Sequence, residues 1–352
     1  MLINNQTDAI FAKTSGMKAN LLDDEDFNQL IRRDTVREIY DYLLENSNYG
    51  EALAKLKGQK IHRGDVELAL YKTNIQSNLK LLHYLGGEYK VFLKTFLRKY
   101  EIEDVKLAIE SVTGRTRITD LENHILSDEA FSDLDMEALF KRDTLEQVME
   151  QLKGTDYYRL LEPYANQVDS KFSFYVEMIL DRYYFSNLLK AMKKLPDKDA
   201  GEARELMQRN VDLYNLEWIY RARKFYDISK EEVLNFTLDG GKKFPYRELE
   251  SLIYDHTFEG MIEVLQKSEY GFMFNHDHDV NLYMERRIER YMYYKSKSLY
   301  RRSILDFGKV VAFILLHEYE VKDITSIIEC KRYKLSSSEI AKYLIRNTEV
   351  TE

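Results

Sequence analysis

One set of four short sequence signals occurs three times along the chain, in the same order and at intervals of about 110 residues. The signals are a threonine followed by helically spaced apolar residues, a glutamate that opens an amphipathic run, a polar residue followed by an aliphatic one, and a Ser/Thr-x-x-Glu box. The first three fall at Thr35, Glu67 and Asp104, at Thr144, Glu177 and Asn215, and at Thr257, Glu285 and Asp323, and the boxes fall at residues 119–122, 229–232 and 336–339. Ordered self-similarity of this kind predicts one helical module present in three copies.

The residues around the third signal form an apolar stripe in every copy. The stripes consist of Ile102, Val105, Ala108 and Ile109, of Leu213, Leu216, Ile219 and Tyr220, and of Val321, Ile324, Ile327 and Ile328. Their spacing fits one face of an α-helix, so we expect them to be buried. The Ser/Thr-x-x-Glu box after each stripe satisfies free amides at a helix start, which predicts a new helix there. Interruptions at residues 86–87, 194–201 and 306–308 predict a turn or a kink before each striped helix.

Proline is scarce in this chain, with only three residues among 352, namely Pro163, Pro196 and Pro245. Since proline disrupts helix interiors and marks turns, this scarcity favours long helices. Few windows show the apolar–polar alternation of strands, and contents of 44% hydrophobic and 32% charged residues are typical of a globular chain. We therefore predict an all-α fold.

The repeat places module boundaries near residues 116 and 227. The three predicted modules are residues 1–115, which include an N-terminal segment without a counterpart, residues 116–226 and residues 227–352. Such modules either stack in a line or close around a pseudo-threefold axis as a funnel with a central cavity. Periodicity alone is compatible with both arrangements, and the odd number of large modules favours the funnel.

Charge and cysteine content narrow the functional classes. A formal net charge of −8 lacks the basic footprint of nucleic-acid binding, so we expect no nucleic-acid partner. The single cysteine, Cys330, excludes an internal disulfide and fits a reducing compartment. The N-terminus lacks a signal-peptide pattern, and the most apolar run, residues 310–316, is far shorter than the roughly 20 residues that span a bilayer. We expect a cytoplasmic protein that contacts the membrane only through a partner.

The sequence contains no nucleophile or nucleotide motif. Neither Gly-x-Ser-x-Gly nor the phosphate-binding P-loop pattern is present, so we expect no nucleotide hydrolysis and no cofactor. The run Asn-His-Asp-His-Asp at residues 275–279 resembles a metal site, but the glycine and charged residues around it favour a solvated loop and no bound metal. The run Gly-Gly-Lys-Lys at residues 240–243 likewise favours a loop, because no strand precedes it.

Two sets of polar residues are candidates for contacts. Arg286, Arg290 and Lys297 recur near helical spacing, which indicates either an ordinary solvated face, the interpretation we favour, or a docking surface for an acidic partner. The repeated polar positions are Glu67, Glu177 and Glu285, together with Asp104, Asn215 and Asp323. Because a polar group beside an apolar stripe usually hydrogen-bonds to a neighbouring segment, we expect a structural role, and lining of a central cavity is the alternative.

Four stretches of the chain resemble the family of C subunits of V-type and A-type rotary ATPases, whose eukaryotic vacuolar counterpart is known as the d subunit. They are Gly16-Met17-Lys18-Ala19-x-Leu21-Leu22, Glu177-x-x-x-Asp181-x-x-Tyr184-Phe185-x-x-Leu188, Asp212-Leu213-x-Asn215-Leu216-x-x-Ile219-x-Arg221 and Glu318-x-Glu320-Val321-x-Asp323-Ile324. The resemblance extends over nearly the whole chain, and the family shares the threefold internal repeat. This chain departs from the pattern at Asp323, where an asparagine is expected.

The resemblance implies a non-catalytic rotor component. Such a protein is a helical funnel on the cytoplasmic face of the proteolipid (c/K) ring, peripheral to the membrane. It receives the central shaft, made of the D and F subunits, and couples shaft to ring during ATP-linked proton or sodium transport. The alternatives are a helical-repeat scaffold or adaptor unrelated to rotary ATPases and, ranked well below it, a metal-dependent enzyme using His276 and His278.

Overall fold

A computed structural model describes residues 4–58, 61–114, 124–165, 171–226, 228–274 and 280–347. Every regular element within these residues is helical, from α1 to α17 with one further 3-10 helix, η2 (Gly271–Phe274). The prediction of an all-α fold is confirmed. Scarce proline is one reason, because proline disrupts helix interiors. Pro163 does lie inside a helix, α9 (Asp156–Ala165), whereas Pro245 immediately precedes one, α13 (Tyr246–Tyr254).

Each copy of the repeat begins with a short helix capped by its threonine. These helices are α3 (Val36–Asn46), α8 (Leu145–Gln151) and α14 (Phe258–Gln266). The threonine hydroxyl accepts a hydrogen bond from the amide three residues further on, at 3.2 Å for Thr35, 3.3 Å for Thr144 and 3.1 Å for Thr257. The first sequence signal is therefore an N-cap, which satisfies one of the amides that a helix start leaves free.

Two long helices follow in each copy. They are α5 (Arg63–Leu82) and α6 (Gly87–Val112), α10 (Phe172–Lys193) and α11 (Asp197–Phe225), and α15 (Val280–Arg302) and α16 (Gly308–Arg332). The breaks between them overlap the three predicted interruptions, although residues 197–201 of the second one lie within α11. Gly87 has a φ of +50°, a left-handed conformation that glycine adopts without a steric penalty.

A further short helix starts at two of the predicted Ser-x-x-Glu boxes. Reciprocal capping between Ser229 and Glu232 starts α12 (Lys230–Asn235), and that between Ser336 and Glu339 starts α17 (Ser337–Tyr343). Both predictions are confirmed, whereas the box at 119–122 lies outside the described residues. The remaining helices are α1 (Asn4–Ala19), α2 (Asp24–Arg32), α4 (Gly50–Ala54) and α7 (Met136–Phe140).

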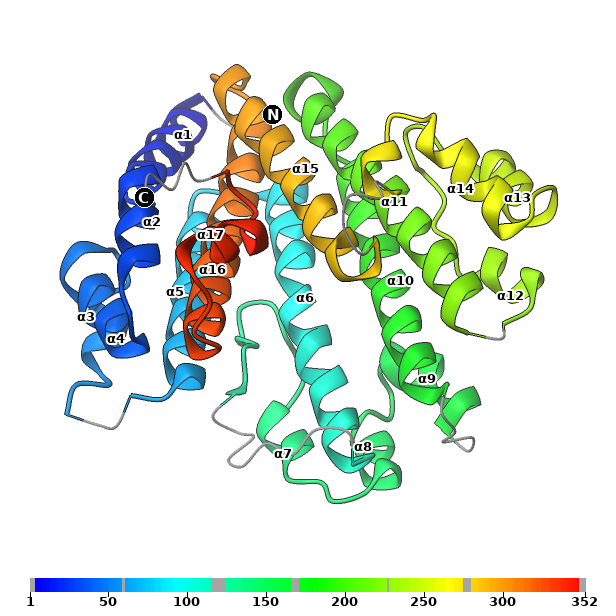
Figure 1. Ribbon diagram of the computed structural model, residues 1–352, viewed down its shortest axis with the longest axis horizontal. Coiled ribbons are helices and arrows are strands. Elements are labelled where there is room, and N and C mark those ends of the chain that lie inside the picture. The colour runs from blue at the N-terminus through cyan, green and yellow to red at the C-terminus, as the bar shows by residue number, and fades with distance from the viewer. Residues whose placement is uncertain are drawn as a thin grey trace. The chain divides into compact units, whose positions relative to one another are not determined.

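The chain forms two compact units. Unit 1 consists of Met1–Gly86, Pro196–Leu206 and Leu265–Glu352, and unit 2 consists of Gly87–Leu195 and Met207–Val264. In unit 1, α16 is central and contacts α1, α2, α3, α5, α15 and α17 (Figure 1). The N-terminal and C-terminal parts of the sequence therefore lie side by side, and residues such as Phe27, Leu43, Val66, Ile324 and Ile340 share one core.

Unit 2 is built around α6 and α10, which pack along each other (Figure 1). Helices α7 and α8 contact α6, α9 contacts α10, and α12 contacts α13. Aromatic side chains fill part of this unit: the Phe174 ring stacks on that of Trp218 with centroids 4.7 Å apart, and the Trp218 indole donates to the carbonyl of Val233 at 3.1 Å. A buried indole that finds an acceptor in this way loses none of its hydrogen bonding on folding.

All twelve residues of the predicted stripes are buried, the most exposed being Tyr220 at 4%. The stripe prediction is therefore confirmed on α6, α11 and α16. Cys330 lies on α16 with 6% exposure, as expected for a small core residue, and burial raises the pKa of its thiol. The boundaries near 116 and 227, and the choice between a linear stack and a closed funnel, stay predictions.

The shared core of unit 1 predicts that the chain does not divide into independent modules. Fragments 1–226 and 227–352 separate Leu22, Phe27 and Leu70 from Val321 and Leu344, which belong to one core. We expect each fragment alone to retain helix but to unfold without a cooperative transition, and co-expression to restore one. Urea unfolding followed by circular dichroism provides the measurement. Cooperative unfolding of both fragments with the stability of the intact chain would show independent domains instead.

Candidate functional site

Three buried polar side chains, one in each copy of the repeat, hold the backbone of a later segment. They are Asp104 on α6, Asn215 on α11 and Asp323 on α16, with exposures of 1%, 0% and 0%. Each binds backbone groups 22 or 23 residues further along the chain. We call these three arrangements the clasps. Because each clasp is buried, its hydrogen bonds replace water for both the side chain and the held backbone.

The clasp of Asn215 uses both ends of its amide. The side-chain nitrogen donates to the carbonyl of Leu238 at 2.9 Å, and the side-chain oxygen accepts from the amide of the same residue at 2.8 Å. Asparagine suits this position because its side-chain amide donates and accepts at the same time without carrying a charge.

The clasp of Asp104 has a carboxylate in place of the amide. It accepts from the amide of Leu126 at 3.1 Å, and from the amide and the hydroxyl of Ser127 at 2.7 and 2.5 Å. Burial raises the pKa of Asp104 to about 6, and the hydrogen bonds from Ser127 and Leu126 oppose that shift. These donors take the place of a cation, which a buried carboxylate otherwise requires.

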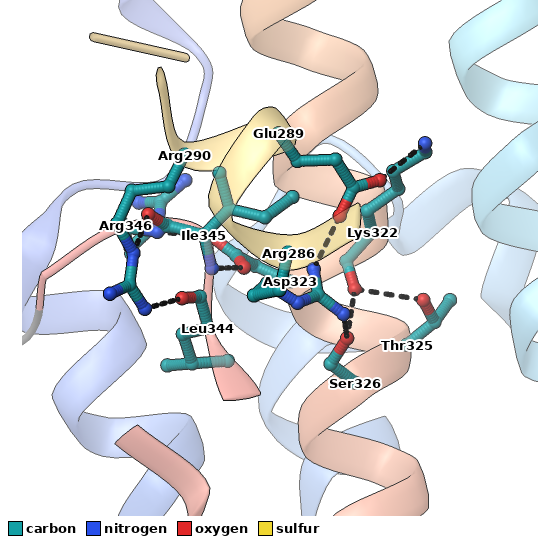
Figure 2. Close-up of polar contacts among 10 residues, drawn as sticks. All are labelled: Arg286, Glu289, Arg290, Lys322, Asp323, Thr325, Ser326, Leu344, Ile345 and Arg346. Atoms are coloured by element: carbon teal, nitrogen blue, oxygen red, sulfur yellow. Dashed lines mark hydrogen bonds and ion pairs between the residues drawn. The ribbon is translucent and has the colours of Figure 1, made fainter. Parts of the chain in front are cut away.

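The clasp of Asp323 is completed by an arginine (Figure 2). Its carboxylate accepts from the amides of Ile345 and Arg346 at 2.6 and 3.3 Å and from Nε of Arg346 at 3.0 Å. The Arg346 guanidinium also lies over the Phe27 ring, 3.3 Å from its centroid. The ion pair explains why aspartate replaces the expected asparagine: a neutral amide would leave the buried charge of Arg346 unbalanced.

The repeated glutamates do not share one environment. Glu67 accepts from Nε of Arg63 at 2.5 Å and lines a cavity of about 530 Å³ together with His62 and Arg332. Glu177 is half-buried on α10, while Glu285 is exposed on α15. The structure thus gives the three glutamates equivalent places along their helices but different surroundings.

Arg286 and Arg290 direct their guanidinium groups to partners within the chain (Figure 2). Arg286 donates to the Ser326 hydroxyl at 3.1 Å and lies 2.9 Å from the carboxylate of Glu289. Arg290 donates to the carbonyls of Leu344 and Ile345 at 2.5 and 3.2 Å. Both side chains therefore fasten α15 to α16 or to the segment after α17. Their role in docking stays a prediction, and a charge reversal at either position would remove these internal contacts as well.

Lys297 lies apart from these two arginines and lines a different cavity, of about 350 Å³, with Lys18, Glu320 and Arg346. Glu320 is 1% exposed and accepts from the amide of Leu22 at 2.7 Å and from the Tyr49 hydroxyl at 2.8 Å. Sequence reasoning missed the role of Glu320. Its position directly before the stripe residue Val321 and three residues before Asp323 was the available signal.

Asp212 is a second polar residue whose role the sequence did not reveal. Its buried carboxylate accepts from the amides of Lys242, Lys243 and Phe244 at 3.1, 2.8 and 3.0 Å. A Cβ atom on Gly241 would lie 2.1 Å from this carboxylate, so the glycine allows the loop to approach. The predicted loop at residues 240–243 is thus confirmed, and its glycine serves the contact with Asp212.

The described part of the chain holds no group of three or more His, Cys, Asp or Glu side chains arranged to bind a metal ion. The metal candidate at residues 275–279 lies outside that part. Among the same described residues, no helix has the length and apolar character that crossing a bilayer requires.

The chain matches the ATP synthase (C/AC39) subunit family over residues 10–343, and it belongs to this family. The match spans parts of both compact units and covers Asp104, Asn215 and Asp323, whereas Ile345 and Arg346, the partners of Asp323, lie just beyond its end. The family resemblance inferred from the four sequence stretches is therefore confirmed.

Relatives of similar length carry the family assignment over almost the whole chain. The A-type ATP synthase C subunit of Methanosarcina mazei is 24% identical over 338 residues, which cover 95% of this chain and 91% of the relative. The protein of the same name from Methanosarcina acetivorans is 26% identical over 339 residues, with the same two coverages. That of Methanocaldococcus jannaschii is 25% identical over 353 residues, covering 95% of this chain and 85% of the relative.

Removal of a clasp is expected to destabilise the fold. Replacing Asn215 with alanine leaves the buried amide and carbonyl of Leu238 unpaired, which costs about 2–4 kcal/mol of the free energy of unfolding. The exposed Asn48 supplies a matched control, because Asn48→Ala should change that free energy by less than about 0.5 kcal/mol. Urea unfolding measures both values. Equal losses for the two variants would show that the clasp contributes nothing.

Glu320 should make stability depend on pH. Burial raises its pKa from an ordinary 4.5 to about 7, opposed by Arg346, Tyr49, Leu22 and Lys18. Folding thus favours the protonated carboxyl of Glu320. Its contribution to the free energy of unfolding is complete below pH 4.5 and is lost as the pH rises to about 7. At about 1.4 kcal/mol per pKa unit, the change is roughly 3 kcal/mol.

The side chain in Glu320→Gln cannot ionise, so this variant does not lose stability as the pH rises from 4.5 to about 7. Its free energy of unfolding should therefore rise relative to that of the wild type by roughly 3 kcal/mol over this range. Unfolding in urea at a series of pH values gives the difference. Glu45→Gln, an exposed control on α3, should keep the wild-type pH profile. An unchanged profile for Glu320→Gln would contradict a buried carboxyl with a raised pKa.

Proposed function

We propose that this chain is a non-catalytic central-stalk subunit of a rotary ATPase. In this function it joins the central shaft, made of the D and F subunits, to the membrane proteolipid ring on the cytoplasmic side. Torque passes through it during ATP-linked transport of protons or sodium ions. Its membrane contact is made through the ring.

The observation that carries this proposal is the family match over residues 10–343. Named relatives that cover 95% of the chain are A-type ATP synthase C subunits, and this chain covers 91% of the first of them. A match that covers more than nine tenths of both proteins favours a role shared by the whole chain over a role of one shared domain.

The internal construction also suits a component that transmits force. A torque-bearing adapter has to deform little under load, and long helices with buried polar contacts resist sliding. In unit 1 the Asp323 clasp fastens α16 to the segment after α17, while Arg290 fastens the same segment to α15. Movement of α16 away from the segment after α17 would leave the buried charges of Asp323 and Arg346 without partners, at a cost of several kcal/mol.

Reconstitution tests this function. The purified shaft complex, which carries the catalytic headpiece, is added to lipid vesicles that contain the proteolipid ring. The mixture is prepared once with the full chain and once without it. We expect assemblies without it to hydrolyse ATP but to show no ATP-driven ion uptake, because shaft and ring are then not joined. Addition of the chain should restore uptake, followed with a fluorescent pH or sodium indicator.

Asn48→Ala, which alters an exposed side chain, is the matched control and should restore uptake as the wild type does. Uptake that is equal with and without the chain would reject the adapter function. Binding of the chain to neither shaft nor ring would favour the alternative, a helical scaffold unrelated to rotary ATPases.

A further inference from the structure

The cavity of about 350 Å³ in unit 1 lies among the end of α1, the turn into α2, helices α15 and α16 and the C-terminal segment. Its buried lining includes Tyr293, Leu316, Glu320 and Arg346, with exposures between 1% and 6%. Asp24, at the start of α2, is exposed on its rim. The cavity therefore combines a buried, partly apolar interior with a charged entrance.

Two ammonium groups line this cavity without an anionic partner of their own. In the described residues, neither Lys18 nor Lys297 has a carboxylate within ion-pair distance, and Lys297 is placed against the Tyr293 ring, 5.8 Å from its Nζ. Burial lowers the pKa of Lys18, and the positive charges of Arg346 and Lys297 lower it further, against the opposing effect of Glu320 and Asp24. A bound anion would relieve this repulsion.

Glu320, Arg346 and Asp23, which also line the cavity, already have partners. Both oxygens of Glu320 accept hydrogen bonds, and Arg346 pairs with Asp323. Asp23 accepts from two amides in the first turn of α2. Asp24 lies in the same first turn, where the helix dipole favours a negative charge. The charges of Asp24 and Glu320 both raise the pKa of Lys18.

We propose that this cavity binds a carboxylate carried on a short apolar stem, supplied by an acidic side chain of the rotary shaft. Lys18 and Lys297 hold the carboxylate, and Leu21, Leu22 and Leu316 contact the stem. The partly apolar lining disfavours inorganic phosphate, because phosphate has no apolar stem to place against Leu21, Leu22 and Leu316 and would lose more hydration on entering the cavity. The identity of the partner rests on the proposed function, whereas the carboxylate specificity does not.

The pocket itself is tested with the full chain and small probes. The lysines are dimethylated with carbon-13-labelled methyl groups, which keeps their charge, and the methyl signals are recorded by NMR. The signals of Lys18 and Lys297 are assigned by their absence in Lys18→Gln and Lys297→Gln. Butyrate should shift both signals saturably and raise the pKa of Lys18, whereas neutral butyramide should not. Inorganic phosphate should bind more weakly than butyrate. Equal shifts with butyrate and butyramide, or stronger binding of phosphate, would overturn the carboxylate specificity.

The partner is tested by binding of the purified D–F shaft complex at two salt concentrations. Lys18→Gln/Lys297→Gln should weaken the affinity by about tenfold or more, because both cations of a largely desolvated carboxylate are lost. Asp24→Asn removes the competing carboxylate and should tighten binding. Lys72→Gln/Lys80→Gln on α5 removes two exposed lysines of the same unit and should leave the affinity unchanged.

The outcomes separate the inference from the proposed function. A wild-type chain that does not bind the shaft contradicts the proposed function, and the butyrate titration then still decides the pocket. Shaft binding that is equally strong in the wild type and in Lys18→Gln/Lys297→Gln overturns the shaft as the source of the carboxylate. Circular dichroism and urea unfolding of each variant ensure that a loss of binding does not come from a loss of folding.

Discussion

The cost of burying a polar group is the constraint on which this structure depends. Asp104, Asn215 and Asp323 lie at 1% exposure or less beside the apolar stripes of their helices. Each would destabilise the fold if its hydrogen bonds were not made, since an unpaired buried group costs about 1–3 kcal/mol. Each therefore requires a backbone segment at one defined place, 22 or 23 residues away. Apolar stripes alone would bury the helices but would not fix where the following segment lies.

The three clasps satisfy the same requirement with different chemistry. Asn215 needs only Leu238, Asp104 needs amides and the Ser127 hydroxyl, and Asp323 needs the charge of Arg346. The third solution has consequences for its surroundings, because Arg346 also lines the cavity that contains Glu320, Lys18 and Lys297. The Asp323 clasp thus connects a structural contact with the pocket that we propose as a docking site. Within the described residues, the contacts of the other two clasps are with backbone groups and a hydroxyl.

If a member of the ATP synthase (C/AC39) subunit family joins a shaft to a ring, it requires a rigid fold rather than catalytic side chains. Helix α16 illustrates how the chain meets that need, since it contacts helices from both ends of the sequence. Arg286 and Arg290 add to the same rigidity by holding α15 against α16 and the C-terminal segment. Interaction with a partner is then left to side chains that are not committed to such internal contacts, and Lys297 with Lys18 fits that description.

The sequence by itself determined the all-α class, the striped helices with their buried faces and the helix starts at two boxes, because capping and apolar periodicity are local properties. The boxes at Ser229 and Ser336 and all twelve stripe residues follow from spacing alone, whereas the structure showed that the threonines of the first signal are caps. The tertiary structure decided which polar residues meet. The partners of Glu320 lie 271 and 298 residues away from it, and such distances leave no local pattern. It also decided that Arg286 and Arg290 bind within the chain while Lys297 lines a cavity, since helical spacing gives the face of a residue but not what lies opposite that face.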